Sequence, residues 1–130
     1  MLDMNKNLSI TAFLGLTAIV LGAFASHALK EKLTVEAISS METAIRYQMY
    51  HVIVLLFVNS YNGFTEKFKN KVSLFFFFGI LFFSGSIYLI YLLGVPVKAI
   101  WFITPLGGGL FVVGWLLLLF FFMKKVINKK

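Results

Sequence analysis

Residues 72–93 read VSLFFFFGILFFSGSIYLIYLL and include no charged side chain. A helix of about 20 residues, rising about 1.5 Å per residue, crosses the roughly 30 Å hydrocarbon core of a bilayer. An aromatic run such as Phe75 to Phe78 would promote aggregation on a water-exposed surface, whereas against acyl chains it is ordinary. This stretch therefore predicts a transmembrane helix.

Three further apolar stretches of similar length lie at about 8–29, 40–61 and 100–123. Of the 130 residues, 60% are hydrophobic and 13% are charged, so a water-soluble domain of this size could not bury its apolar surface. The polar connections are too short to hold a second domain. We therefore expect an all-α fold, an integral membrane bundle of four transmembrane helices that forms one domain over residues 1–130.

The first of these stretches also resembles a signal peptide. Lys6 precedes the apolar run, and Ala23-Phe24-Ala25 comes directly before Ser26, where a signal peptidase would cut. We expect the segment to remain attached as the first transmembrane helix.

The distribution of charge sets the expected orientation. The net charge is +7, and with four spans both termini lie on one side of the membrane. That side holds eight of the twelve basic residues, so the positive-inside rule predicts cytoplasmic N- and C-termini. The lysines do not form one basic face, which argues against a nucleic-acid partner. The eight are Lys6, Lys67, Lys69, Lys71, Lys124, Lys125, Lys129 and Lys130.

The composition also limits the available chemistry. There is no cysteine, which excludes disulfides, thiolate nucleophiles and iron–sulfur clusters. His27 and His51 lie at heights that differ by more than about 10 Å, which argues against their ligating one haem iron. No triad of residues has metal-ligand spacing. We expect no metal, no cofactor and no enzymatic activity.

His51 is the most unusual residue of the predicted spans. It lies about 16 Å along the second span, near the bilayer midplane, where an ionisable side chain is costly and is a candidate functional group. Near pH 7 a histidine changes charge readily, so His51 could handle protons or a ligand. Alternatively, a neutral His51 would bond neighbouring helices together.

Other polar residues occupy the outer halves of the spans, while the inner halves hold no ionisable group. This pattern indicates a polar pocket that opens outward above an apolar floor, rather than a continuous pore. The candidate pocket residues are His27, Arg46, Tyr47, Gln48, His51, Ser84, Ser86 and Thr104.

Two residues at the start of the second span have a structural interpretation. Ser39-x-x-Glu42 matches a capping box, in which both side chains bond free backbone N–H groups at a helix start. Glu42 and Arg46 are also spaced as an i, i+4 ion pair in the favourable order. We therefore interpret both as an interfacial anchor rather than as catalytic groups.

The fourth span contains an unusual segment, TPLGGG at residues 104–109. Pro105 removes an N–H group, and Gly107, Gly108 and Gly109 add backbone freedom. One interpretation is a broken helix whose freed carbonyl groups line a cavity and bind a cation or substrate. The other is a kink that lets the span pack tightly.

The first span carries small residues at helical spacing: Gly15, Ala18, Gly22 and Ala25. Such a stripe allows two helix backbones to approach closely. It predicts a packing surface, either within the monomer or between protomers.

Five short motifs follow one another in a characteristic order. They are GAFASHAL (22–29), YQMYH (47–51), FSGSIY (83–88), ITPLGG (103–108) and GW (114–115). On these motifs the chain resembles the YgdD/YwdK-type family of small four-span bacterial membrane proteins, domain of unknown function 423. The family pattern usually reads Gly-Ala where this chain has Ala25-Ser26, a change between small residues. The resemblance implies a four-helix inner-membrane protein and, because the family has no established activity, no particular function.

The shortage of chemistry favours a non-enzymatic accessory or assembly subunit of a larger membrane complex. The sequence shows no metal triad, no nucleophile–base pair and no polar path through the membrane. The expected partners are membrane lipids and either other membrane protein subunits or further copies of the chain. The alternative is a small-solute or proton-linked transporter or binding protein, with an outward-facing polar pocket around His51.

Overall fold

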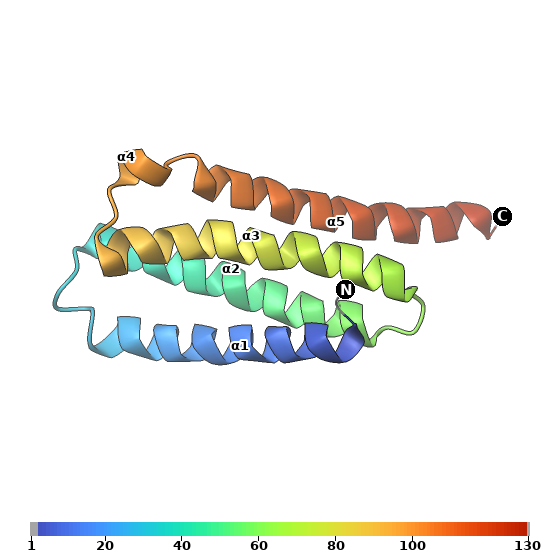
Figure 1. The fold of residues 1–130 in the computed structure, drawn as a ribbon, viewed down its shortest axis with the longest axis horizontal. Helices are drawn as coiled ribbons and strands as arrows, with labels where there is room; N and C mark the ends of the chain where they lie inside the picture. Colours follow the sequence, from blue (N-terminus) through green and yellow to red (C-terminus); the bar gives the residue numbers. More distant parts are fainter. Residues whose placement is uncertain (1–2, 130) are drawn as a thin grey trace.

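The computed structural model describes residues 3–129, and its regular structure is entirely helical (Figure 1). The predicted all-α fold is confirmed. Lys130, one of the eight basic residues counted above, lies outside the described residues. The helices are α1 (Met4–His27), α2 (Val35–Ser60), α3 (Glu66–Leu93), α4 (Val97–Ile100) and α5 (Ile103–Asn128).

Short polar side chains define the starts of the first three helices. Asp3, Thr34 and Thr65 each accept a hydrogen bond from the backbone N–H three residues further on, at 2.8–3.1 Å. The predicted capping box of Ser39 and Glu42 is wrong, because the helix begins earlier and Thr34 caps it. Both residues instead lie inside α2.

Successive long helices run in opposite directions, so α1 begins and α5 ends at the same end of the bundle (Figure 1). We call this the terminal end and the opposite end, which carries α4, the α4 end. α2 packs against α1 and α3, whereas α5 packs mainly against α3, and α1 touches α3 only lightly. α1 and α5 are therefore the two edge helices of the bundle, on either side of the α2–α3 pair.

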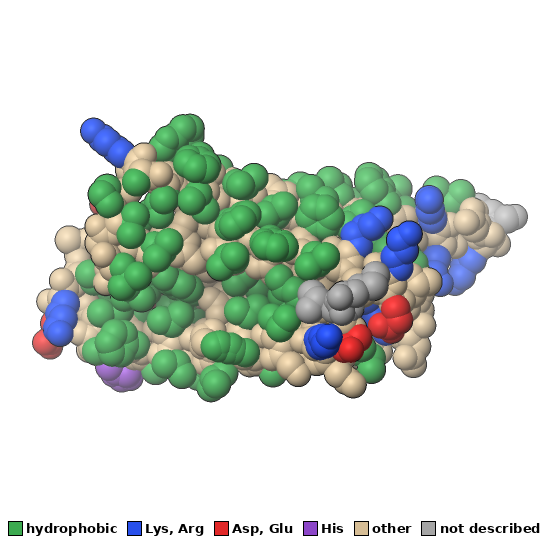
Figure 2. Space-filling view, viewed as in Figure 1, with side chains coloured by type: hydrophobic (Ala, Val, Ile, Leu, Met, Phe, Trp, Pro, Cys, Tyr) green, Lys and Arg blue, Asp and Glu red, His purple; other side chains and the backbone are tan. Residues whose placement is uncertain are grey.

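Three segments are long and apolar enough to cross a membrane: Met4–His27, Glu66–Leu93 and Val97–Asn128. α2 is less apolar because Arg46, Gln48 and His51 lie within it. On the face shown in Figure 2, hydrophobic side chains cover the middle of the molecule and charged side chains gather towards its ends. This distribution is the one that a bilayer requires.

Small residues on the edge helices permit close helix packing. A Cβ at Gly107 of α5 would overlap the backbone of Phe83, and one at Gly114 would overlap the ring of Phe76. On α1, Ala18 and Ala25 are buried. The small-residue stripe of α1 thus packs against α2 within the chain, with the backbone at Gly15 close to Val52.

The predicted helix break at Pro105, Gly107, Gly108 and Gly109 is wrong. α5 is continuous from Ile103 to Asn128, and the interruption falls before it, at residues 101–102. Pro105 lies in the first turn of α5, where a backbone N–H has no partner within the helix, so the missing N–H costs little there. The three glycines continue the regular helix, and Gly107 serves the contact with α3.

Candidate functional site

His51 is almost fully buried, at 5% exposed, and packs among aromatic rings. Its imidazole stacks on Phe111 with 3.7 Å between ring centroids and is tilted against Phe76 at 5.1 Å. The indole N–H of Trp115 donates to Nε2 at 3.0 Å, and Nδ1 lies 2.7 Å from the carbonyl oxygen of Tyr47. His51 therefore connects α2 to α5.

These two contacts assign the proton on the imidazole. An indole N–H can only donate, so Nε2 of His51 accepts and carries no proton. A carbonyl oxygen can only accept, so Nδ1 carries the proton and donates a hydrogen bond to the carbonyl oxygen of Tyr47. His51 is thus a neutral ring with both nitrogens engaged, which is the arrangement expected of a side chain that bonds helices together.

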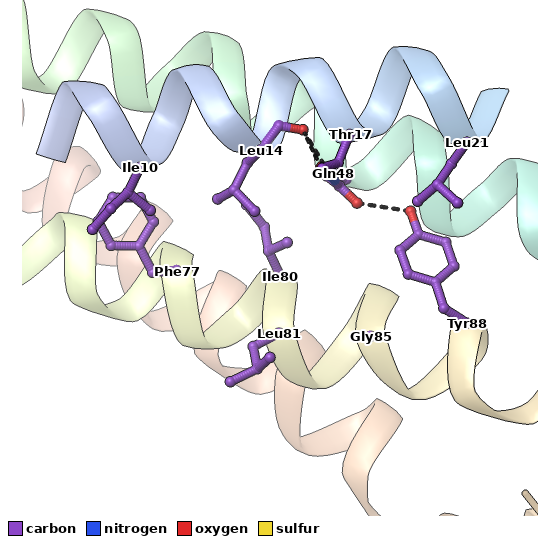
Figure 3. Close-up of a pocket in the computed structure, with 10 residues that line it drawn as sticks. All are labelled: Ile10, Leu14, Thr17, Leu21, Gln48, Phe77, Ile80, Leu81, Gly85 and Tyr88. Atoms are coloured by element: carbon purple, nitrogen blue, oxygen red, sulfur yellow. Dashed lines mark hydrogen bonds between the residues drawn. The ribbon is translucent and has the colours of Figure 1, made fainter. Parts of the chain in front are cut away.

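Gln48 connects three helices and is 2% exposed. Its amide nitrogen donates to the carbonyl oxygen of Leu14 at 2.7 Å and to the hydroxyl of Thr17 at 2.9 Å, both on α1. Its amide oxygen accepts from the hydroxyl of Tyr88 on α3 at 2.7 Å. Figure 3 shows Gln48 between α1 and α3, bonded to the carbonyl oxygen of Leu14 and to the hydroxyl of Tyr88. With the bond to Thr17, both N–H groups and the oxygen of its amide are engaged.

A groove of about 410 Å³ lies between α1 and α3, beside Gln48 (Figure 3). Apart from Gln48, Thr17 and Tyr88, its walls are apolar or glycine. Of the eight predicted pocket residues, Gln48 alone lines this groove. The remaining lining residues are Ile10, Leu14, Leu21, Phe77, Ile80, Leu81 and Gly85.

The two predicted serines are buried and bond to neighbouring groups. The hydroxyl of Ser84 donates to the carbonyl oxygen of Ala44 on α2 at 2.7 Å. Ser86 donates to the carbonyl of Phe83 in its own helix at 2.9 Å and hydrogen-bonds the hydroxyl of Thr104 on α5. Ser84 and Ser86 therefore link α3 to a different neighbour each.

Three of the predicted pocket residues are exposed. His27 ends α1 at the α4 end. Arg46 donates to the hydroxyl of Thr43 at 3.3 Å, and Tyr47 stacks on Phe83 at 5.0 Å. Arg46 does not form the predicted ion pair, because its guanidinium points to Thr43 instead.

Among residues 3–129, one ion pair has its charged atoms within 4.0 Å. It joins Nζ of Lys69 to Oε1 of Glu66 at 3.6 Å. Glu42 is exposed and takes no part in it.

The candidate residues are thus distributed over separate contacts rather than around one cavity. Gln48 points between α1 and α3, whereas His51 points towards α5. Ser84 is bonded to α2 and Ser86 to α5. Their role in binding a solute stays a prediction, but the polar groups of Gln48, His51, Ser84 and Ser86 are already engaged with other side chains or with the backbone.

A buried polar cluster at the terminal end was not predicted. The amide nitrogen of Asn7 on α1 donates to the side-chain oxygens of Asn59 on α2 and Asn70 on α3, both at 2.9 Å. Asn59 in turn donates to the hydroxyl of Ser73 at 2.9 Å. The cluster lies at the ends of the helices rather than in the middle of the spans, so the apolar floor stays a prediction. The side-chain oxygen of Asn7 is buried without a hydrogen-bond partner in the described structure.

The asparagine cluster had a signal in the sequence. Asn7, Asn59 and Asn70 all lie at the ends of the apolar runs that face the terminal end. Antiparallel neighbours bring such ends together, and asparagine bonds well between helices in lipid. Their individual spacing, however, does not show that the three side chains meet.

The helical fold, its apolar surface and its buried bonds between helices define a helical membrane protein. The family described as "Protein of unknown function (DUF423)" matches residues 21–108, and the chain belongs to this family. The predicted family is thereby confirmed.

Two relatives agree with this assignment. A UPF0382 membrane protein of Staphylococcus saprophyticus is 46% identical over 101 residues, which cover 78% of this chain and 82% of the relative. A UPF0382 membrane protein of Haemophilus influenzae is 39% identical over 112 residues, covering 86% and 89%. No solved structure matches the chain. The protein is therefore a membrane protein of an uncharacterised family.

Proposed function

We propose that the protein is a non-enzymatic accessory or assembly subunit of a larger membrane complex. The observation that carries this proposal is that the buried polar side chains of the candidate site are engaged in bonds between helices. Examples are the bonds of His51 with Trp115, of Gln48 with Tyr88 and of Ser84 with the backbone of α2. To bind a substrate, such a group would first have to give up a bond that holds two helices together.

We further propose that α2 is a fourth span and that both termini are cytoplasmic, in the bacterial plasma (inner) membrane. Its polar side chains support this, because Gln48 and His51 are covered by the other helices and polar residues in spans face the interior of a bundle. The excess of lysines towards the terminal end supports the orientation. Under this proposal the protein is a multi-pass membrane protein.

The orientation can be tested with single cysteines, since the native chain has none. Lys98→Cys at the α4 end and Lys129→Cys at the terminal end are both exposed positions. In intact cells, a membrane-impermeant maleimide is expected to label position 98 and not position 129. The reverse result, or equal labelling, would overturn the proposed topology.

The subunit role can be tested by capture. A tagged full-length chain, produced at native level and cross-linked in the membrane, is expected to co-purify with one or more membrane proteins in fixed stoichiometry, or with further copies of itself. A strictly monomeric chain that captures no stoichiometric partner would contradict the proposal.

The transporter alternative depends on His51. It would require this ring to leave its contacts with Trp115 and Tyr47 during a transport cycle. Replacement His51→Ala, assayed for proton-linked flux in proteoliposomes, is expected to change nothing beyond stability. Loss of a pH-dependent flux from a folded variant would favour transport instead.

A further inference from the structure

A second groove, of about 420 Å³, lies on the exposed face of α3 beside α5. Its walls are formed by apolar side chains together with one lysine. Leu74 and Phe78 are 42% and 47% exposed, so the groove is open to the surroundings of the bundle. The lining residues are Lys71, Leu74, Phe75, Phe78, Phe82 and Leu110.

The groove extends from one membrane surface to the middle of the bilayer. The ring of Phe111 packs on Gly79 and stacks on His51, so both residues lie at the depth of the middle of α3. Lys71 precedes Gly79 by eight residues, which places it about 12 Å nearer the terminal end. The hydrocarbon of one leaflet is about 15 Å thick, so Lys71 lies close to its outer edge. Phe82 follows Gly79 by three residues, and its side chain points back towards the terminal end.

A second lysine continues the line of the groove towards the membrane surface. Five residues of α3 follow one another in steps of three or four, which keeps them within an arc of about 80° on the helix. They are Lys67, Lys71, Leu74, Phe78 and Phe82. Both lysines are exposed. Side chains of α3 point towards its N-terminus, so the two ammonium groups extend towards water at the terminal end.

The two lysines are not neutralised by the part of the chain that the structure describes. Glu66, their neighbour in sequence, is paired instead with Lys69, which is 4% exposed. No carboxylate lines the groove among the described residues. Basic side chains also gather towards the terminal end in Figure 2. The ammonium of Lys71 is therefore available to an anion at the depth where lipid phosphates lie.

We propose that this groove binds one anionic phospholipid from the leaflet at the terminal end. The phosphate binds Lys71, and Lys67 adds a second positive charge on the water side. One acyl chain lies along Leu74 and Phe78 and ends near the middle of the bilayer. The inference rests on α3 spanning the membrane and does not depend on the proposed subunit role. With the termini oriented as proposed above, this leaflet is the cytoplasmic one.

The charges favour this lipid over two other occupants. A zwitterionic lipid carries an ammonium group beside its phosphate, and the two lysines repel that group. A transmembrane helix of another protein would fill the apolar groove but would have to place a carboxylate near Lys71 to pair with it. Acidic side chains within the membrane are costly and rare.

Native mass spectrometry of the full-length chain in detergent, titrated with dioleoyl lipids, tests the proposal. We expect phosphatidylglycerol to bind about tenfold more tightly than phosphatidylcholine, because each lysine near the surface favours an anionic lipid by about fivefold and water partly screens the outer one. Lys71→Gln is expected to reduce this preference to about twofold, since the contribution of one lysine is lost. Lys71→Arg keeps the cation and is expected to keep the preference.

Two control variants separate this site from general attraction to the membrane. Lys6→Gln removes an exposed charge at the same end, but on α1, and is expected to leave the preference as it is. Leu74→Trp narrows the groove and is expected to weaken both lipids, without repacking the core because Leu74 is exposed. Leu56→Trp adds the same bulk at a position of α2 that is 44% exposed and is expected to weaken neither.

Four outcomes would overturn the proposal. They are equal affinity of the native chain for the two lipids, an unchanged preference in Lys71→Gln, an equal loss of preference in Lys6→Gln, and photo-cross-linking from position 78 in membranes to a polypeptide rather than to lipid. The lipid titration uses the isolated chain, so its failure is distinguishable from a failure to capture a partner subunit.

Discussion

The two edge helices, α1 and α5, are attached to the α2–α3 pair by different means. α1 packs its small residues against α2 and is tied to the pair by several side-chain hydrogen bonds, which join Asn7 to α2 and α3 and Gln48 to Leu14 and Thr17 of α1. α5 is held by close packing, with Gly107 against the backbone of Phe83 and with rings stacked around His51. In lipid there is little hydrophobic drive between helices, so both attachments must come from such specific contacts. We expect each lost hydrogen bond to weaken the attachment of α1 by one step. The close contact of α5 with α3, by contrast, leaves almost no room for an added atom.

The largest effect is expected where α5 approaches α3 most closely. In Gly107→Ala the new Cβ would overlap backbone atoms of Phe83, which cannot rotate away. We expect the free energy of unfolding in mixed micelles to fall by about 3 kcal/mol. The control is Gly109→Ala, whose Cβ meets no atom within 4 Å, so that better helix propensity should stabilise by up to about 1 kcal/mol. Equal effects of the two variants would contradict the packing argument.

The next effect concerns the asparagine cluster that holds α1. Asn59→Leu removes one of the two acceptors of Asn7 and the donor to Ser73, so that one amide N–H of Asn7 and the Ser73 hydroxyl each lose a buried partner. The free energy of unfolding is expected to fall by about 2 kcal/mol. Ser60→Ala changes an exposed neighbour and is expected to have almost no effect. If the two variants unfold alike, the cluster does not contribute to the attachment of α1.

A smaller effect is expected at Gln48. Gln48→Leu loses the bonds to α1 and to Tyr88, and we expect a loss of about 1.5 kcal/mol, at the upper end of values for bonds between membrane helices. Ile10→Cys with Phe77→Cys places a thiol on each wall of the α1–α3 groove. Disulfide formation between them is expected to change in rate when Gln48 is replaced. An unchanged rate would show that Gln48 does not set the distance between these helices.

The smallest effect is expected at His51. His51→Phe keeps a ring to stack on Phe111 but loses the acceptor of Trp115. We expect a loss of only about 0.6 kcal/mol, the mean for such bonds in a membrane protein. The loss of stability is measured by monitoring unfolding through tryptophan fluorescence. Trp115 reports on this site because its indole N–H loses its acceptor in the variant. A loss several times larger would mean that α5 depends on this bond as strongly as on its glycines.

The apolar runs could be predicted from the sequence, but the full helices could not. Hydropathy marks the part of each helix that fits the hydrocarbon core, whereas α2 and α3 begin in the polar segments before it, at the caps Thr34 and Thr65. The end of α3 was predicted correctly because Gly94, with φ of +71°, terminates it. Pro105 was misleading, since a proline in the first turn begins a helix rather than breaking it.

For the candidate site, the sequence identifies which side chains are polar but not which ones meet. The partner of His51 is Trp115, 64 residues further on, and their pairing depends on how α2 and α5 are rotated about their axes. That rotation is set by contacts such as Gly114 with Phe76, which no local spacing reveals. The sequence therefore identifies Gln48 and His51 as polar residues within an apolar stretch, but not the different directions in which they point.

The asparagine cluster also has a consequence for how the protein is made. Asn7 is synthesised first, yet its two acceptors lie 52 and 63 residues later in the chain. When α1 leaves the ribosome, neither acceptor exists, so its amide must be solvated by water, lipid headgroups or the insertion machinery until residue 70 has been added. α1 is therefore the first helix to enter the membrane, but it can form its final contacts only after α3 has been inserted.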